Sequence, residues 1–129
     1  MNENEVGTVV VDAAIAVHRE LGNGLLESVY EAALAIELEQ RGVRVERQVP
    51  VEVFYRGQSL DQGFRADLIV GGLVILELKS VEAISPVHKK QIQTYLSLTG
   101  LKLGYLLNFG AALMKNGIFR CVNGLDDPQ

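Results

Sequence analysis

The sequence predicts an α/β fold in which helices flank a mixed central sheet. Two helical stretches open the chain, alternating apolar residues follow, and a third helical stretch then separates two short apolar strands. Strands joined by a helix run parallel, whereas the alternating stretches fit an antiparallel three-strand meander. With 129 residues, of which 48% are hydrophobic, the chain is expected to form one domain with its own core.

Three stretches have the apolar periodicity of helices. The first covers residues 5–20, and Gly22 follows where a left-handed cap would end it. The second, LLESVYEAALAIELEQRG, is rich in helix-forming residues, carries an apolar stripe and is closed by a glycine. A serine N-cap followed by a proline at the first helical position predicts the third helix, residues 86–98.

Five stretches have the pattern of strands: VRVERQVPVEVFYRG, residues 59–70, 73–79 and 102–109, and the weaker GIFRCV. Pro50 cannot donate a backbone hydrogen bond, so it suits an edge strand or a bulge. Strand 73–79, helix 86–98 and strand 102–109 together predict a crossover unit with parallel strands.

Composition excludes several classes of protein. The longest apolar run, Leu68 to Leu76, has the length of a strand and falls far short of the roughly 20 residues of a membrane span. The N-terminus MNENEVGT is acidic where a secretory signal would be basic, so we expect a cytoplasmic protein with no membrane partner. The only cysteine, Cys121, cannot form an internal disulfide and is expected to be a small core residue.

Three charged residues interrupt one apolar stretch: Asp67, Glu77 and Lys79. Unpaired charges are expensive to bury, so their presence there indicates a joint task. Glu77 and Lys79 are two apart on a strand and share a face, roughly 6 to 7 Å from each other. Pairing Val70 with Val74 would place Asp67 directly across from Glu77, whereas a two-residue glycine turn would put it on the opposite face. We therefore predict an odd-length loop or a bulge.

Two carboxylates beside an ammonium favour a divalent-metal site, while a strand end that emerges into solvent is the alternative. Glu27 and Glu31, one helical turn apart, form a like-charge pair that a nearby cation would relieve; the alternative is that both are solvated. Gln91 and Tyr95, four apart, form a polar stripe on the third expected helix. The alternative for that stripe is an amphipathic surface with a half-buried tyrosine.

Longer motifs carry a family resemblance. GLLESVYEAAL, residues 24–34, has Gly24, Glu27 and Tyr30 at the spacing G-x-x-E-x-x-Y. The match extends over nearly the whole chain, through the stretches FRADLIV, VILELKS, HKKQIQTYLSLTG and LGYLLNFG. On these motifs the chain resembles the GxxExxY proteins of the PDDEXK nuclease superfamily. The resemblance implies a restriction-endonuclease-like core: a helix, a three-strand meander, a helix and a further strand.

The resemblance also implies roles for individual residues. These are Asp67 and Glu77 as metal ligands, Lys79 as the motif lysine, Glu27 or Glu31 as an assisting group, and Gln91 and Tyr95 as the Q-x-x-x-Y element of the RecB-like branch. We expect a backbone carbonyl, that of Leu78, and the carboxylate of Glu27 or Glu31, directly or through water, to complete the ligand set. Hard oxygen ligands of this kind suit Mg²⁺ or Mn²⁺.

We therefore expect a magnesium- or manganese-dependent nuclease that hydrolyses phosphodiester bonds in nucleic acid, with DNA favoured over RNA. Pairing of two protomers into a homodimer, to cut two strands, is left open. The alternative is a non-catalytic nuclease-like module that binds a protein or nucleic-acid partner. The net charge of -4 favours this alternative, because nucleic acid attracts basic proteins. The intact D…E-x-K set favours catalysis, because a module that only binds has no need of it.

Overall fold

The computed structural model describes residues 1–126, apart from the side chains of residues 61 and 62. Its elements, in chain order, are α1 (Glu3–Leu21), α2 (Glu27–Gln40), β1 (Val45–Tyr55), β2 (Gln58–Val70), β3 (Val74–Lys79), α3 (Pro86–Thr99), β4 (Leu103–Asn108), the short 3-10 helix η1 (Met114–Gly117) and β5 (Ile118–Val122). The predicted class and order of elements are confirmed. No helix in the described part of the chain is long and apolar enough to cross a membrane.

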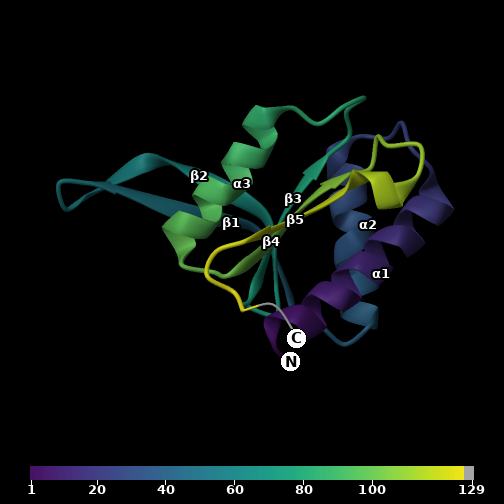
Figure 1. The fold of residues 1–129 in the computed structure, drawn as a ribbon, viewed down its shortest axis with the longest axis horizontal. Helices are drawn as coiled ribbons and strands as arrows, with labels where there is room; N and C mark the ends of the chain where they lie inside the picture. Colours follow the sequence, from purple (N-terminus) through teal and green to yellow (C-terminus); the bar gives the residue numbers. More distant parts are fainter. Residues whose placement is uncertain (127–129) are drawn as a thin grey trace.

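The strands form one five-stranded sheet in the order β1-β2-β3-β4-β5. The first three make an antiparallel meander, α3 carries the chain across to β4 parallel to β3, and β5 returns antiparallel. Figure 1 shows α1 and α2 on one side of the sheet and α3 on the other, with the β1–β2 hairpin reaching far beyond the helices. The mixed sheet is consistent with a restriction-endonuclease-like core.

The caps that the sequence predicts are present at α3 but not at the C-terminal end of α1. At α3, Ser85 caps the first turn, Pro86 takes the first helical position, and Gly100 ends the helix in the left-handed conformation, with φ 73° and ψ 4°. At α1, Gly22 has a positive φ of 70° but an extended ψ of -171°. The left-handed cap predicted at Gly22 is therefore wrong, because the chain leaves the helix there in an extended direction.

The loop between β2 and β3 has the odd length that the sequence predicts. Val70 pairs with Val74 and Leu68 with Leu76, so residues 71–73 form a three-residue loop. Gly71 and Gly72 both have positive φ, a conformation that glycine adopts without steric strain. If the same pairing is continued by one residue beyond Leu68 and Leu76, residue 67 lies opposite residue 77.

The sheet separates two apolar clusters. The larger one, beneath α1 and α2, contains Val74, Leu76 and Leu78 of β3, while the smaller one, beneath α3, contains Ile75. Alternate side chains of this strand therefore enter opposite clusters. Cys121 is partly buried at the margin of the smaller cluster.

Candidate active site

Asp67 and Glu77 lie where β2 and β3 stop pairing through their backbones. The last backbone pair on this side is Leu68 with Leu76. Beyond it, Glu77 Oε1 accepts a hydrogen bond from the Asp67 backbone N–H at 3.2 Å, and Asp67 Oδ2 accepts one from the Leu78 backbone N–H at 2.8 Å. Each carboxylate therefore accepts a backbone N–H in place of a carbonyl oxygen of the ladder. These two hydrogen bonds hold both side chains in position.

Both carboxyl groups are poorly solvated. Glu77 is only 4% exposed, and its burial, reinforced by the negative charge of Asp67, raises its pKa to about 8. Burial is also the main cause that raises the pKa of Asp67, with a contribution from the charge of Glu31. Two neighbouring carboxylates in such surroundings resist ionising together unless a cation joins them.

Lys79 lies beside the two carboxylates. Its positive charge lowers the pKa of both Asp67 and Glu77, although burial outweighs that effect. Its place at the end of β3 is fixed by the neighbouring strand, because the Phe109 backbone N–H donates to the Lys79 carbonyl at 2.8 Å. The Asn108 side chain then holds the next segment through two hydrogen bonds of 3.0 Å with the backbone of Val81.

Helix α3 places Tyr95 close to Asp67 and Glu77. The Tyr95 side chain is buried, and this burial, followed by the charges of Glu77 and Asp67, raises its pKa to about 12. Gln91, one turn earlier on α3, donates its Nε2–H to the Tyr95 hydroxyl oxygen at 3.3 Å. The alternative of a half-buried surface tyrosine is therefore wrong, because only 3% of Tyr95 is exposed.

The two glutamates of α2 have different surroundings. Glu31 is buried, and its Oε2 accepts hydrogen bonds from Arg47 Nε at 3.1 Å and Arg47 Nη2 at 3.0 Å. Glu27 is exposed, and its carboxylate accepts the backbone N–H of Ser80, the residue after Lys79, at 3.3 Å. Of the two, Glu31 is therefore the one whose charge reaches Asp67.

Gln48 connects Glu31 to Asp67 and was missed by the sequence reasoning. Its Nε2 donates to Glu31 Oε1 at 2.5 Å and to Asp67 Oδ1 at 3.4 Å. Its backbone has a φ of 51°, which is uncommon for a residue other than glycine and costs of the order of 1 kcal/mol or more. Arg47 and Val49 pair with β2 on either side of it. The distortion interrupts the strand at the position that faces Asp67, and the valine alternation, which continues at odd positions on both sides, gives no sign of it.

The donor set fits a small divalent cation held by two protein carboxylates. Among the residues that the structure describes, no group of three or more histidine, cysteine, aspartate or glutamate side chains is placed to share an ion. Mg²⁺ is usually bound by one or two carboxylates, with water and substrate phosphates in its remaining positions. Asp67 and Glu77 supply such a pair, and a cation would offset both the burial and the repulsion by Asp67 that raise the pKa of Glu77.

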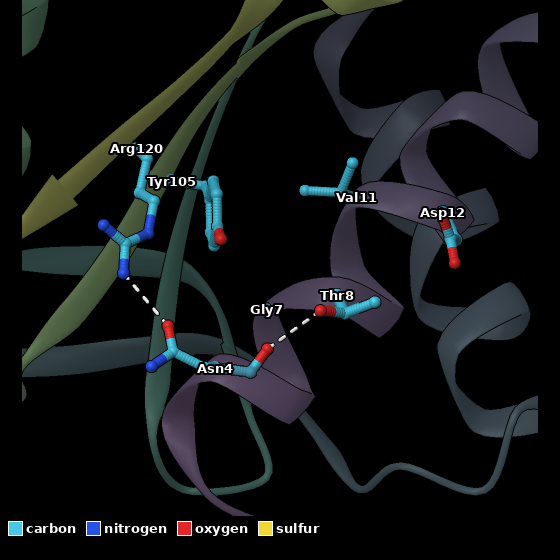
Figure 2. Close-up of a pocket in the computed structure, with 7 residues that line it drawn as sticks. All are labelled: Asn4, Gly7, Thr8, Val11, Asp12, Tyr105 and Arg120. Carbon is cyan, nitrogen blue, oxygen red and sulfur yellow. Dashed lines mark hydrogen bonds between the residues drawn. The ribbon is translucent and has the colours of Figure 1, made fainter. Parts of the chain in front are cut away.

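A separate cavity of about 550 Å³ lies on the other face of the sheet. It is bounded by α1 and by the strands that carry Tyr105 and Arg120 (Figure 2). Arg120 Nη2 donates to Asn4 Oδ1 at 3.0 Å across its mouth. Tyr105 belongs to the cluster beneath α1 and α2, whereas Glu77 faces the other way, so this cavity contributes nothing to the carboxylate pair.

Comparison with known proteins agrees with the motifs. A family model described as PD-(D/E)XK nuclease superfamily matches residues 4–121, a span that includes every residue placed in the candidate active site. Searches of curated proteins and of solved structures found no match to this chain. The narrower resemblance to the GxxExxY proteins stays a prediction.

Proposed function

This chain belongs to the PD-(D/E)XK nuclease superfamily, and we propose that it is a divalent-metal-dependent nuclease that hydrolyses phosphodiester bonds in nucleic acid. The observation that carries the proposal is the pair of carboxylates held by backbone N–H groups, Glu77 by that of Asp67 and Asp67 by that of Leu78, with the charge of Lys79 close to both. These residues occupy the D…E-x-K positions of the sequence. DNA as the preferred substrate, and a homodimer as the acting form, stay predictions.

Asp67 and Glu77 would hold the Mg²⁺ or Mn²⁺ ion. Such an ion supplies a bound water of lowered pKa and neutralises negative charge on the attacked phosphate. Glu31 already bonds to Arg47 and Gln48, so it acts on the site through Gln48 and through its negative charge on Asp67. Direct ligation by Glu27 or by the carbonyl of Leu78 stays a prediction.

The remaining side chains act on the phosphate and the nucleophile. Lys79 places a positive charge beside the carboxylates, where it orients the nucleophile or stabilises the charge that develops on the phosphate oxygens. Tyr95 keeps its proton at neutral pH, because its pKa is raised to about 12. Since Gln91 donates to the tyrosine oxygen, the hydroxyl proton is free to point toward a phosphate oxygen or a carboxylate.

The proposal is tested by incubating the pure protein with single- and double-stranded DNA and RNA in Mg²⁺ or Mn²⁺. Asp67→Ala and Lys79→Ala are expected to lower the cleavage rate by about 100-fold or more, because each removes a charge from the reacting centre. Asp12→Ala and Lys115→Ala, which remove exposed charges elsewhere, are matched controls. Cleavage that is unchanged in both site variants would indicate a contaminant or a different site.

A non-catalytic module is the second candidate, and the net charge of -4 favours it. Calorimetry separates the two, because a module has no use for the cation. Binding of Mn²⁺ that is lost in Asp67→Asn and Glu77→Gln supports the enzyme. A protein that binds nucleic acid equally well with and without divalent metal, and never cleaves it, supports the module.

A further inference from the structure

A second, apolar pocket adjoins the candidate active site. Its volume is about 200 Å³, and it is lined by Phe64 of β2 and by Val87, Lys90, Gln91, Thr94 and Tyr95 of α3. Gln91 and Tyr95 belong to both places, so the pocket and the carboxylate pair share a wall. Phe64 lies three residues before Asp67 on the same strand. A ligand group in this pocket would therefore sit next to the reacting centre.

Phe64 is an aromatic ring left open to solvent at this position. It meets the Tyr95 ring in a T-shaped contact, with 5.3 Å between the ring centroids and 68° between the planes, yet 44% of Phe64 remains exposed. Val87, on the pocket's other wall, is 75% exposed. Large apolar side chains gathered around a hollow beside polar catalytic groups are typical of a binding site rather than of ordinary surface.

The size and chemistry of the pocket suit a single flat ring system. Its volume lies below the roughly 300 to 1,000 Å³ of pockets that hold drug-sized ligands. Lys90 adds a positive charge to its lining. An aromatic side chain for stacking, combined with basic groups for the backbone, is the recurring means of holding single-stranded nucleic acid.

We propose that this pocket is a nucleobase subsite, in which an unpaired base next to the attacked phosphate stacks against Phe64. Bases inside a duplex have both faces covered by their neighbours, so only an unstacked base can offer a free face. The substrate is therefore single-stranded nucleic acid, or a single-stranded segment of a longer duplex. The inference rests on the proposed function, because that function places the phosphate at Asp67 and Glu77.

The test measures binding separately from cleavage. A short single-stranded oligonucleotide with a fluorescent base analogue at its centre is titrated with Asp67→Asn protein in Mg²⁺, so that the strand stays intact. Stacking on Phe64 is expected to quench the analogue, and Phe64→Leu in the same background is expected to weaken binding by about five-fold or more. Phe64→Tyr, which keeps the ring, is expected to bind normally. Phe54→Leu is the matched control, because Phe54 is an exposed phenylalanine of β1 that does not line the pocket.

A second variant tests the subsite independently, in case Phe64→Leu does not fold. Val87→Asp adds a negative charge at the pocket, and an acidic residue in the first turn of a helix does not destabilise that helix. It is expected to weaken single-strand binding several-fold while the melting temperature stays unchanged. Equal affinities of the parent, Phe64→Leu and Val87→Asp proteins would overturn the subsite, as would tighter binding of the matched duplex.

The two proposals fail in different ways. Cleavage that depends on Asp67 but is insensitive to Phe64→Leu, together with unchanged binding, would overturn the subsite alone. Quenching that depends on Phe64 in a protein that never cleaves would support the subsite and contradict the nuclease. Absence of binding to any nucleic acid would overturn the subsite and leave a protein partner as the occupant of this surface.

Discussion

The two faces of the sheet bury different kinds of side chain, although the same strands build both. Toward α1 and α2, Leu68, Leu76 and Leu78 pack into a continuous apolar cluster. Toward α3, the apolar cluster is smaller, and the neighbouring positions on the same strands are the half-buried carboxylate of Asp67 and the buried carboxylate of Glu77. The comparison teaches that the apolar face stabilises the fold, and this stability offsets the cost of burying like charges on the face that holds the site.

The apolar face should therefore show the largest effect on stability. Leu76→Ala removes a fully buried side chain and is expected to lower the free energy of unfolding by about 2 to 5 kcal/mol, measured by urea denaturation. Ile36→Ala, at a 59% exposed position of α2, is the control and should change it by less than about 0.5 kcal/mol. A loss below about 1 kcal/mol for Leu76→Ala would mean that this face does not carry the fold.

On the face that carries Asp67 and Glu77, removal of a charge should lower activity and raise stability. Glu77→Gln keeps the shape of the side chain and removes a buried charge. We expect cleavage to fall by about 100-fold or more, while the protein at pH 8 without metal becomes more stable. Cleavage rates and melting temperatures measured on the same preparation check both expectations. Loss of stability along with loss of cleavage would contradict the division between the two faces.

The pH dependence of stability should reveal the same buried charge. The pKa of Glu77 is raised from 4.5 to about 8 in the folded protein, so between these values the folded state binds more protons than the unfolded state. The free energy of unfolding without metal therefore falls as pH rises through this window, by at most about 1.4 kcal/mol per pH unit from this group. The raised pKa of Asp67 acts in the same direction.

Denaturation in a metal chelator, at several pH values from 5 to 8, measures this slope. Glu77→Gln should flatten it, and added Mg²⁺ should restore stability to the parent protein near pH 8. Parallel curves for the parent and the variant would mean that Glu77 ionises normally.

The smallest expected effects distinguish the residues that position Asp67. Gln48→Ala removes the bridge from Glu31 to Asp67 and is expected to weaken Mn²⁺ binding by about ten-fold, as is usual when a partner of a metal ligand is lost. Glu27→Gln should weaken it by less than about two-fold, because Glu27 contacts Ser80 and neither carboxylate of the pair. Calorimetry of both variants checks this, and a larger effect for Glu27→Gln would restore Glu27 as the predicted ligand.

The sequence was sufficient to predict the part of the site that depends on strand geometry. Side chains alternate along a strand, so the loop at residues 71–73 decided whether Asp67 and Glu77 meet, and the two glycines there limited the choices. The position of Tyr95 followed from its spacing on a helix that packs against the same face.

The rest depended on contacts between distant segments. Glu27 and Glu31 are equivalent in the helical pattern, and the position of Arg47 and Gln48 beside α2 decides that Glu31 is the buried one. Gln48 occupies a strand in the sequence pattern, yet its positive φ arises where β1 meets both Glu31 and Asp67. The spacing of residues along the sequence does not reveal that these segments come into contact.

The central claim is that Asp67 and Glu77 share one divalent ion. A crystal of the protein grown with Mn²⁺ and an uncleaved single-stranded oligonucleotide tests it most directly, through the anomalous scattering of the metal. The account predicts one Mn²⁺ peak bonded to a carboxylate oxygen of each residue, with a phosphate oxygen of the strand as a further ligand. A fully occupied oligonucleotide site without that peak, or a peak that touches only one of the two carboxylates, would contradict the account.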